Sequence, residues 1–107
     1  MAEWPQDADG DVLRRLKDAG LDFATPHTLD FNVDFDSWPP KPEAVALLTA
    51  WFPSARLIEP DGGDPGYALF QIFEKLSYEV VVGVQAKVSR AMRPFGGVCE
   101  SWGILQE

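Results

Sequence analysis

Residues 29–36 alternate strictly between apolar and polar side chains. The apolar positions are Leu29, Phe31, Val33 and Phe35, and the polar positions between them are Asp30, Asn32, Asp34 and Asp36. Because successive side chains of a β-strand point to opposite faces of the sheet, this segment predicts a strand with one apolar and one acidic face. Such a strand indicates a sheet that helices cover on one side and leave uncovered on the other.

A first helix is expected between Asp9 and Gly20. Apolar side chains recur there at helical spacing, at Val12, Leu13, Leu16 and Ala19. Asp9 suits the N-cap position, where a carboxylate accepts a hydrogen bond from a free backbone N–H group. Gly20 suits the left-handed residue that follows many helices.

Two more helices are expected, at residues 43–52 and 77–94. Pro42 fits the first turn of the former, and Pro53 ends it. The latter contains three consecutive valines, which favour a strand, but it is too long for a typical strand. Its apolar residues also recur at helical spacing, at Val81, Val84, Val88 and Met92. Since Ser77 can cap its start, we predict a helix.

Three further strands are expected, at residues 54–59, 67–74 and 98–105. The predicted order is helix, strand, helix, strand, strand, helix, strand. A helix that links two strands crosses to the apolar side of the sheet, and two interleaved units of this kind form a split βαβ arrangement. The predicted fold class is therefore α+β: a ferredoxin-like sandwich with a four-stranded antiparallel sheet, two helices on one face and an extra N-terminal helix.

The chain has 107 residues and a net charge of −8. This length predicts a single domain over residues 1–107. The acidic charge argues against direct binding to nucleic acid and favours a basic partner, although it can also serve solubility alone. With one cysteine, no signal-peptide pattern at the start and no apolar run long enough to cross a bilayer, the sequence predicts a cytoplasmic protein without a membrane partner.

No catalytic residue, metal site or cofactor is expected. His27, the one histidine, follows Pro26 at the entrance of a strand, where an ordinary structural role is typical. One histidine and one cysteine do not supply the four ligands of a zinc site. Asp61-Gly62-Gly63-Asp64 has the composition of a turn. Simple alternation places Cys99 on the opposite face from Trp102, which we assign to the core together with Ile104.

The strand at residues 67–74 is apolar on both faces, so one apolar set must lie on the uncovered side of the sheet. Aromatic and aliphatic groups beside carboxylates are typical of a protein interface. The candidate partner-binding residues are Asp30, Asn32, Asp34, Asp36, Tyr67, Leu69 and Phe73. The carboxylates can dock a basic segment or discourage unwanted association, and the same surface can pair two copies of the chain.

Several short motifs, taken in order, resemble the regulator of ribonuclease E activity B family. They are Asp11-Val12-Leu13-Arg14-Arg15-Leu16, Ala19-Gly20-Leu21-Asp22, Pro26 with the strand at 30–35, Phe95-Gly96-Gly97 and Ser101-Trp102-Gly103. The similarity extends from about Gly10 to Leu105. Ser101 stands where the family more often has glycine.

This resemblance implies a ferredoxin-like α/β sandwich and a cytoplasmic, non-catalytic protein that binds and inhibits ribonuclease E. We therefore expect a protein-binding regulator that acts through an acidic surface. Its expected partner is ribonuclease E or another basic segment of the RNA-decay machinery, and it is expected to be a monomer or a weak homodimer. The alternative is a dimeric ferredoxin-like small-ligand binder or enzyme, with a pocket between sheet and helices lined by His27 or by convergent carboxylates.

Overall fold

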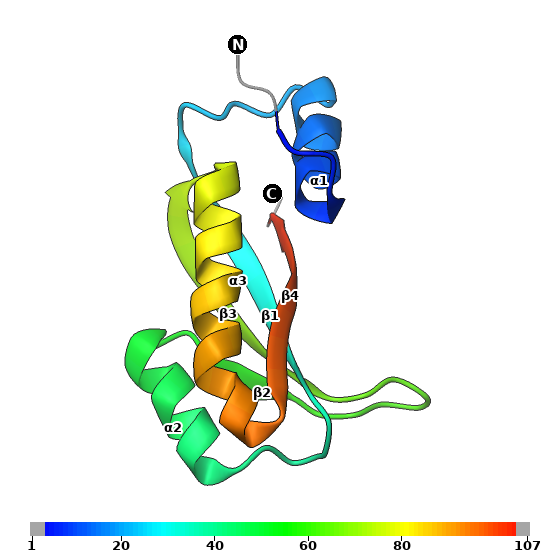
Figure 1. The fold of residues 1–107 in the computed structure, drawn as a ribbon, viewed down its shortest axis with the longest axis vertical. Coiled ribbons are helices and arrows are strands. Elements are labelled where there is room, and N and C mark those ends of the chain that lie inside the picture. The colour runs from blue at the N-terminus through cyan, green and yellow to red at the C-terminus, as the bar shows by residue number, and fades with distance from the viewer. Residues whose placement is uncertain (1–3, 105–107) are drawn as a thin grey trace.

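The computed structural model describes residues 4–104, and Figure 1 shows the arrangement of their helices and strands. The elements are α1 (Ala8–Asp18), β1 (Pro26–Phe35), α2 (Pro42–Trp51), β2 (Arg56–Ile58), β3 (Tyr67–Lys75), α3 (Tyr78–Met92), the 3₁₀ turn η1 (Arg93–Phe95) and β4 (Gly97–Ile104). Their order and approximate bounds confirm the predicted elements. Leu105, the predicted end of the last strand, lies outside the described residues.

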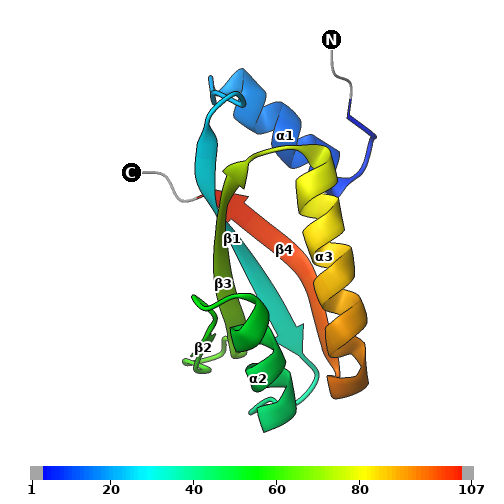
Figure 2. The same cartoon turned by 90° about the vertical axis from the view of Figure 1, so that its left-hand side faces the viewer.

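The sheet has the strand order β2-β3-β1-β4, and every neighbouring pair is antiparallel. The units β1-α2-β2 and β3-α3-β4 are interleaved, because a strand of each lies between the two strands of the other. Figures 1 and 2 show α2 and α3 on the same face of this sheet. The α+β class and the four-stranded antiparallel sheet are thus confirmed, and the closer likeness to ferredoxin-like proteins stays a prediction.

The core lies between this face of the sheet and the helices. Leu29, Phe31 and Val33 of β1 are fully buried, as the alternation predicts. Phe31 stacks on Phe70 of β3, its cross-strand partner, with 5.3 Å between ring centroids. The helices add buried side chains at Ala44, Leu48, Val81, Val88 and Met92. Burial of these apolar surfaces is the main driving force for folding.

A bulge in β4 places Cys99 in the core, so the prediction that it points away is wrong. The register between β1 and β4 shifts between Asn32 and Val33, so that Phe31 lies opposite Trp102 and Val33 opposite Cys99. An extra residue in one strand reverses the alternation beyond it. Cys99 and Trp102 therefore share the core face. Trp102 is half-buried and packs against the core, as does Ile104.

The thiol of Cys99 is expected to be unreactive in the folded protein. Burial, with Asp34 and Glu100 nearby, raises its pKa to about 12, and the thiolate is the form that reacts. Iodoacetamide at pH 8 should leave the native protein unmodified over an hour and alkylate the chain in guanidinium, as mass spectrometry would record. Rapid alkylation of the native protein would contradict the buried position.

Helix α1 lies across one end of the molecule, beside the end of β4 and the start of α3 (Figures 1 and 2). Its N-cap is Asp7 and not the predicted Asp9: the Gly10 N–H donates to Asp7 Oδ1 over 2.7 Å. The Tyr78 hydroxyl donates to the other oxygen over 2.6 Å. These two bonds, with that from Tyr78 the larger cause, lower the pKa of Asp7.

Asp9 instead joins α1 to the sheet and to α3. The Trp102 indole N–H donates to Asp9 Oδ1 over 2.8 Å, and the Gln85 amide donates to Oδ2 over 3.2 Å. Two carboxylates stand two residues apart at the start of this helix, and either satisfies the local rule for an N-cap. The contacts with Tyr78 and Trp102 decide between them, and a local rule does not include such contacts.

Two serine hydroxyls bond to backbone groups at the outer edges of the sheet. Ser89 of α3 donates to the Cys99 carbonyl over 3.1 Å and accepts from the Cys99 N–H over 2.8 Å. Ser54 makes the same pair of bonds to Gln71 of β3, over 3.1 and 2.9 Å, beyond the short strand β2. Each hydroxyl thus makes the two backbone hydrogen bonds that a neighbouring strand would otherwise make to that residue.

Candidate functional site

The candidate site is the face of the sheet that α2 and α3 leave uncovered. We call it the open face; its residues are Pro26, Thr28, Asp30, Asn32, Asp34, Arg56, Ile58, Tyr67, Leu69, Gln71, Phe73, Lys75, Val98, Ser101 and Gly103. Cross-strand partners share a face of a sheet. The register therefore brings together six of the seven residues singled out from the sequence.

Asp36, the seventh candidate, lies beyond the end of β1. Its N–H donates to the Gly96 carbonyl over 2.9 Å. Its carboxylate lies so close to the Cα of Gly96 that any Cβ there would collide with it, and Gly96 also has a left-handed φ of 75°. Asp36 therefore supports the turn before β4 and is separated from the row of Asp30, Asn32 and Asp34.

Strand β3 supplies the apolar part of the open face. Ala68 and Phe70 are buried, so the opposite set, Tyr67, Leu69 and Phe73, is the one that faces outward. Phe73 is 72% exposed. A large exposed apolar side chain among other apolar residues is typical of a surface that another protein covers.

The neighbouring strands extend this apolar surface in a way that the sequence analysis missed. Ile58 of β2 lies opposite Tyr67, and Val98 of β4 lies opposite Asp34 and is 38% exposed. Arg56 adds a cation beside Leu69. Leu57 points to the core, so alternation along β2 could have predicted that Ile58 points outward. The outward direction of Val98 depends on the bulge in β4, which the sequence pattern does not indicate.

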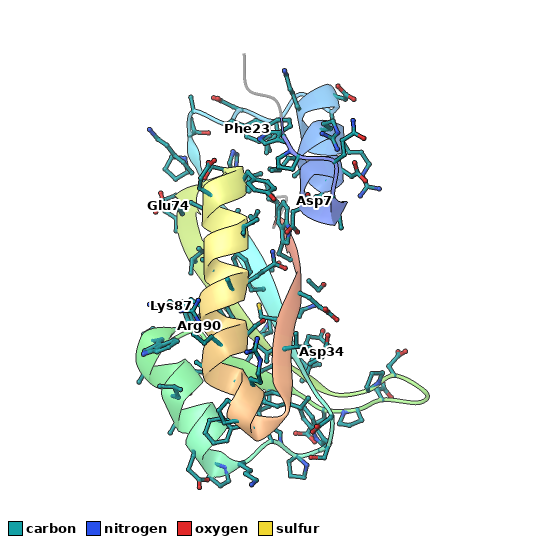
Figure 3. All side chains as sticks on the ribbon, viewed as in Figure 1. Asp7, Phe23, Asp34, Glu74, Lys87 and Arg90 are labelled. Carbon is teal, nitrogen blue, oxygen red and sulfur yellow. The ribbon has the colours of Figure 1, made fainter. Side chains whose placement is uncertain are left out.

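The carboxylates of the open face differ in their surroundings. Asp30 Oδ1 accepts a hydrogen bond from the Gln71 amide over 2.6 Å. Asp34 is exposed and lies between Tyr67 and Val98. Figure 3 shows Asp34 beyond β4, whereas Lys87 and Arg90 point away from the other side of α3. Asp34 is thus on a different side of the molecule from these two cations of α3.

A cleft of about 510 Å³ lies between α1, the segment after it and the start of α3. It is lined by Trp4, Lys17, Leu21, Phe23, Leu76, Ser77, Tyr78 and Glu79. Figure 3 shows Phe23 at this end of the molecule, away from Asp34. Neither His27 nor a pair of carboxylates lines the cleft. It therefore differs from the pocket that the small-ligand alternative predicted.

Two other cavities give the small-ligand alternative little support. Between α2 and the sheet, the space beside Leu48 and Ala68 holds about 30 Å³, which is room for water but not for a larger ligand. A shallow groove of about 320 Å³ along α3 and β4 is lined by Asp9 and Glu100. Both oxygens of Asp9 already accept hydrogen bonds, so these two carboxylates are not a free pair.

The remaining residue types that often take part in catalysis or metal binding do not form a site in the described part of the chain. His27 Nε2 donates to the Asp22 carbonyl over 2.7 Å at the entrance of β1. Residues 4–104 contain no cluster of three or more histidine, cysteine or acidic side chains suited to a metal ion. In the same range, no helix is both long and apolar enough to cross a membrane.

The fold and the open face define an α+β protein whose candidate site is an exposed sheet surface. The model of the family "Regulator of ribonuclease activity B" matches residues 6–104, nearly the whole chain, and the chain belongs to this family. This confirms the resemblance seen in the sequence. The family regulates ribonuclease activity and is not a family of enzymes. No curated protein matches the chain.

Proposed function

We propose that this protein regulates a ribonuclease by binding it through the open face, without catalysing a reaction. The observation that carries the proposal is the row of Asp30, Asn32 and Asp34 beside the outward side chains of β3, where Phe73 is 72% exposed. A solvated carboxylate next to exposed aromatic surface is the composition of a protein interface with a polar rim.

The partner surface that fits the open face is a basic segment with apolar residues. Carboxylates accept short, charge-assisted hydrogen bonds from arginine and lysine. Tyr67, Leu69 and Phe73 supply apolar area that loses contact with water when a partner covers it. The family match makes ribonuclease E, or another component of the RNA-decay machinery, the partner to test first.

The proposed regulation acts by occupying a segment of the nuclease that then cannot make its other contacts. The net charge of −8 repels RNA, so the protein acts on the nuclease and not on its substrate. A flexible basic segment of the nuclease would become ordered against the open face, and its other contacts would then be lost. The proposed localisation is the cytoplasm, where RNA decay takes place, with the protein acting as a monomer or a weak homodimer.

Asp34→Lys is expected to weaken nuclease binding about tenfold, equivalent to about 1.4 kcal/mol. The substitution places a cation where the partner presents cations, while the backbone of β1 stays unchanged. Isothermal titration with purified ribonuclease E, and a parallel assay of RNA cleavage, measure binding and inhibition. Affinity of the natural sequence should also fall as salt rises, because exposed charges are screened.

Asp18→Lys is the matched control, because it makes the same change of charge at an exposed residue at the end of α1. Binding by this variant should equal that of the natural sequence. Equal weakening by both variants would assign the effect to net charge. Unchanged binding by Asp34→Lys would remove the open face from the interaction.

A further inference from the structure

We infer that Asp34 and Tyr67 together form a seat for one arginine side chain of the protein partner. This inference rests on the proposed function and specifies the chemistry that the open face recognises. Asp34 lies directly opposite Tyr67 on β3 and Val98 on β4. Directly opposed side chains have Cβ atoms about 4.5–5.5 Å apart, so the side chain of Asp34 starts between those of Tyr67 and Val98 on the same face.

Asp34 differs from its neighbours in being available. Asp30 accepts a hydrogen bond from Gln71, and Asp36 lies against Gly96. Within residues 4–104, no side chain donates a hydrogen bond to the Asp34 carboxylate or forms an ion pair with it. Two cations of the described residues share the open face. Arg56 lies on β2, two strands away, or roughly 10 Å at the usual strand spacing, and Lys75 lies at the far end of β3, opposite Pro26.

The surroundings of Asp34 match a guanidinium group better than an ammonium group. A guanidinium donates two parallel hydrogen bonds to a carboxylate, and its flat face stacks on an aromatic ring such as that of Tyr67. Val98 can pack against the methylene stem of the same side chain. Asn32, two residues along β1 on the same face, adds an amide oxygen as a further acceptor. A lysine ammonium can use the charge of Asp34 but not the planar arrangement.

Two synthetic peptides test this inference: an 11-residue alternation of glycine and arginine, and the same peptide with lysine at every arginine. Each is titrated into the ¹⁵N-labelled full chain, and amide shifts are followed by NMR. The arginine peptide should bind about fivefold more tightly, the size expected from stacking of a cation on an exposed ring. The largest shifts should fall at Asp34, Tyr67 and Val98.

Variants separate the two contributions. Asp34→Asn should weaken binding of both peptides. Tyr67→Leu should weaken binding of the arginine peptide more than that of the lysine peptide, and so remove the preference for arginine. Asp64→Asn is the control, because it neutralises an exposed carboxylate in the turn between β2 and β3. The ¹⁵N spectrum of each variant reports directly whether it is folded.

The outcomes distinguish this inference from the proposed function. Equal affinity for the two peptides, or shifts concentrated away from Asp34, overturns the arginine seat whatever the nuclease does. Loss of nuclease binding in Asp34→Lys then still supports the open face as the binding surface. Conversely, an arginine preference at Asp34 together with unchanged nuclease binding by Asp34→Lys overturns the proposed function and with it the role of the seat.

Discussion

Replacing Phe31 with alanine is expected to lower the free energy of unfolding by about 3–5 kcal/mol, the usual cost of truncating a fully buried phenylalanine. Phe31 has no exposed surface and stacks on Phe70, which in turn stacks on Phe52 after α2. The cavity would therefore open where the two central strands meet the helical layer. Since small proteins have about 5–15 kcal/mol of stability, a large part of it would be lost. Denaturation in urea, followed by circular dichroism, measures the change.

Phe73→Ala is the matched control for this experiment. It removes the same atoms from the neighbouring strand, but from a side chain that is 72% exposed. Surface substitutions of this kind usually change stability by no more than about 0.5 kcal/mol. Similar losses for the two variants would contradict the assignment of the two faces of the sheet.

Asp9→Ala is expected to cost about 2–3 kcal/mol, because each hydrogen bond to a charged group contributes about 1.5–3 kcal/mol and the two here share one carboxylate. The substitution removes the acceptor of the Trp102 indole and of the Gln85 amide. Gln85 is 8% exposed, so water replaces the lost bond poorly. The shift of the Trp102 indole N–H resonance reports the lost contact directly, and urea denaturation gives the energy.

Asp11→Ala is the control for the Asp9 variant. Asp11 also lies in the first turn of α1, so both variants lose the same favourable interaction with the helix dipole. Its partner is the exposed Arg14 on the same helix, and such pairs contribute about 0.3–0.5 kcal/mol. A cost for Asp9→Ala no greater than that for Asp11→Ala would show that α1 is not attached through Asp9.

The long patterns in the sequence were sufficient to predict the elements. The alternation from Leu29 to Phe35 recurs as the buried and outward faces of β1, and the helical spacing from Val81 to Met92 outweighs the strand preference of three consecutive valines. These patterns are reliable because each repeats over several residues, and burial of one face stabilises the same secondary structure at every position of the repeat.

Single-residue details were harder to predict. The N-cap of α1 was assigned to Asp9 because two similar carboxylates compete there, and the choice of Asp7 depends on Tyr78, which is distant in sequence. The orientation of Cys99 depends on a bulge, and a bulge leaves little signal in one sequence. Both errors have the same cause, since tertiary contacts decided between local alternatives of similar energy.

The candidate site was predictable in its central part and not at its margins. Asp30, Asn32 and Asp34 follow from the alternation of one strand, and the outward position of Tyr67, Leu69 and Phe73 follows once Ala68 and Phe70 are buried. Arg56 and Val98 belong to the same surface through the pairing of β2 and β4 with their neighbours. Strand pairing is a property of the folded chain, which explains why the separation of Asp36 was also missed.

The hydroxyls of Ser54 and Ser89 have a consequence for how the sheet meets other molecules. Each occupies the main-chain groups of one rim residue, Gln71 or Cys99, to which an incoming extended peptide would otherwise pair. Lateral growth of the sheet is thereby hindered at both rims, which lowers the risk of polymerisation into fibres. The protein can thus present a broad, partly apolar sheet surface to a partner with less edge-to-edge pairing between its own copies.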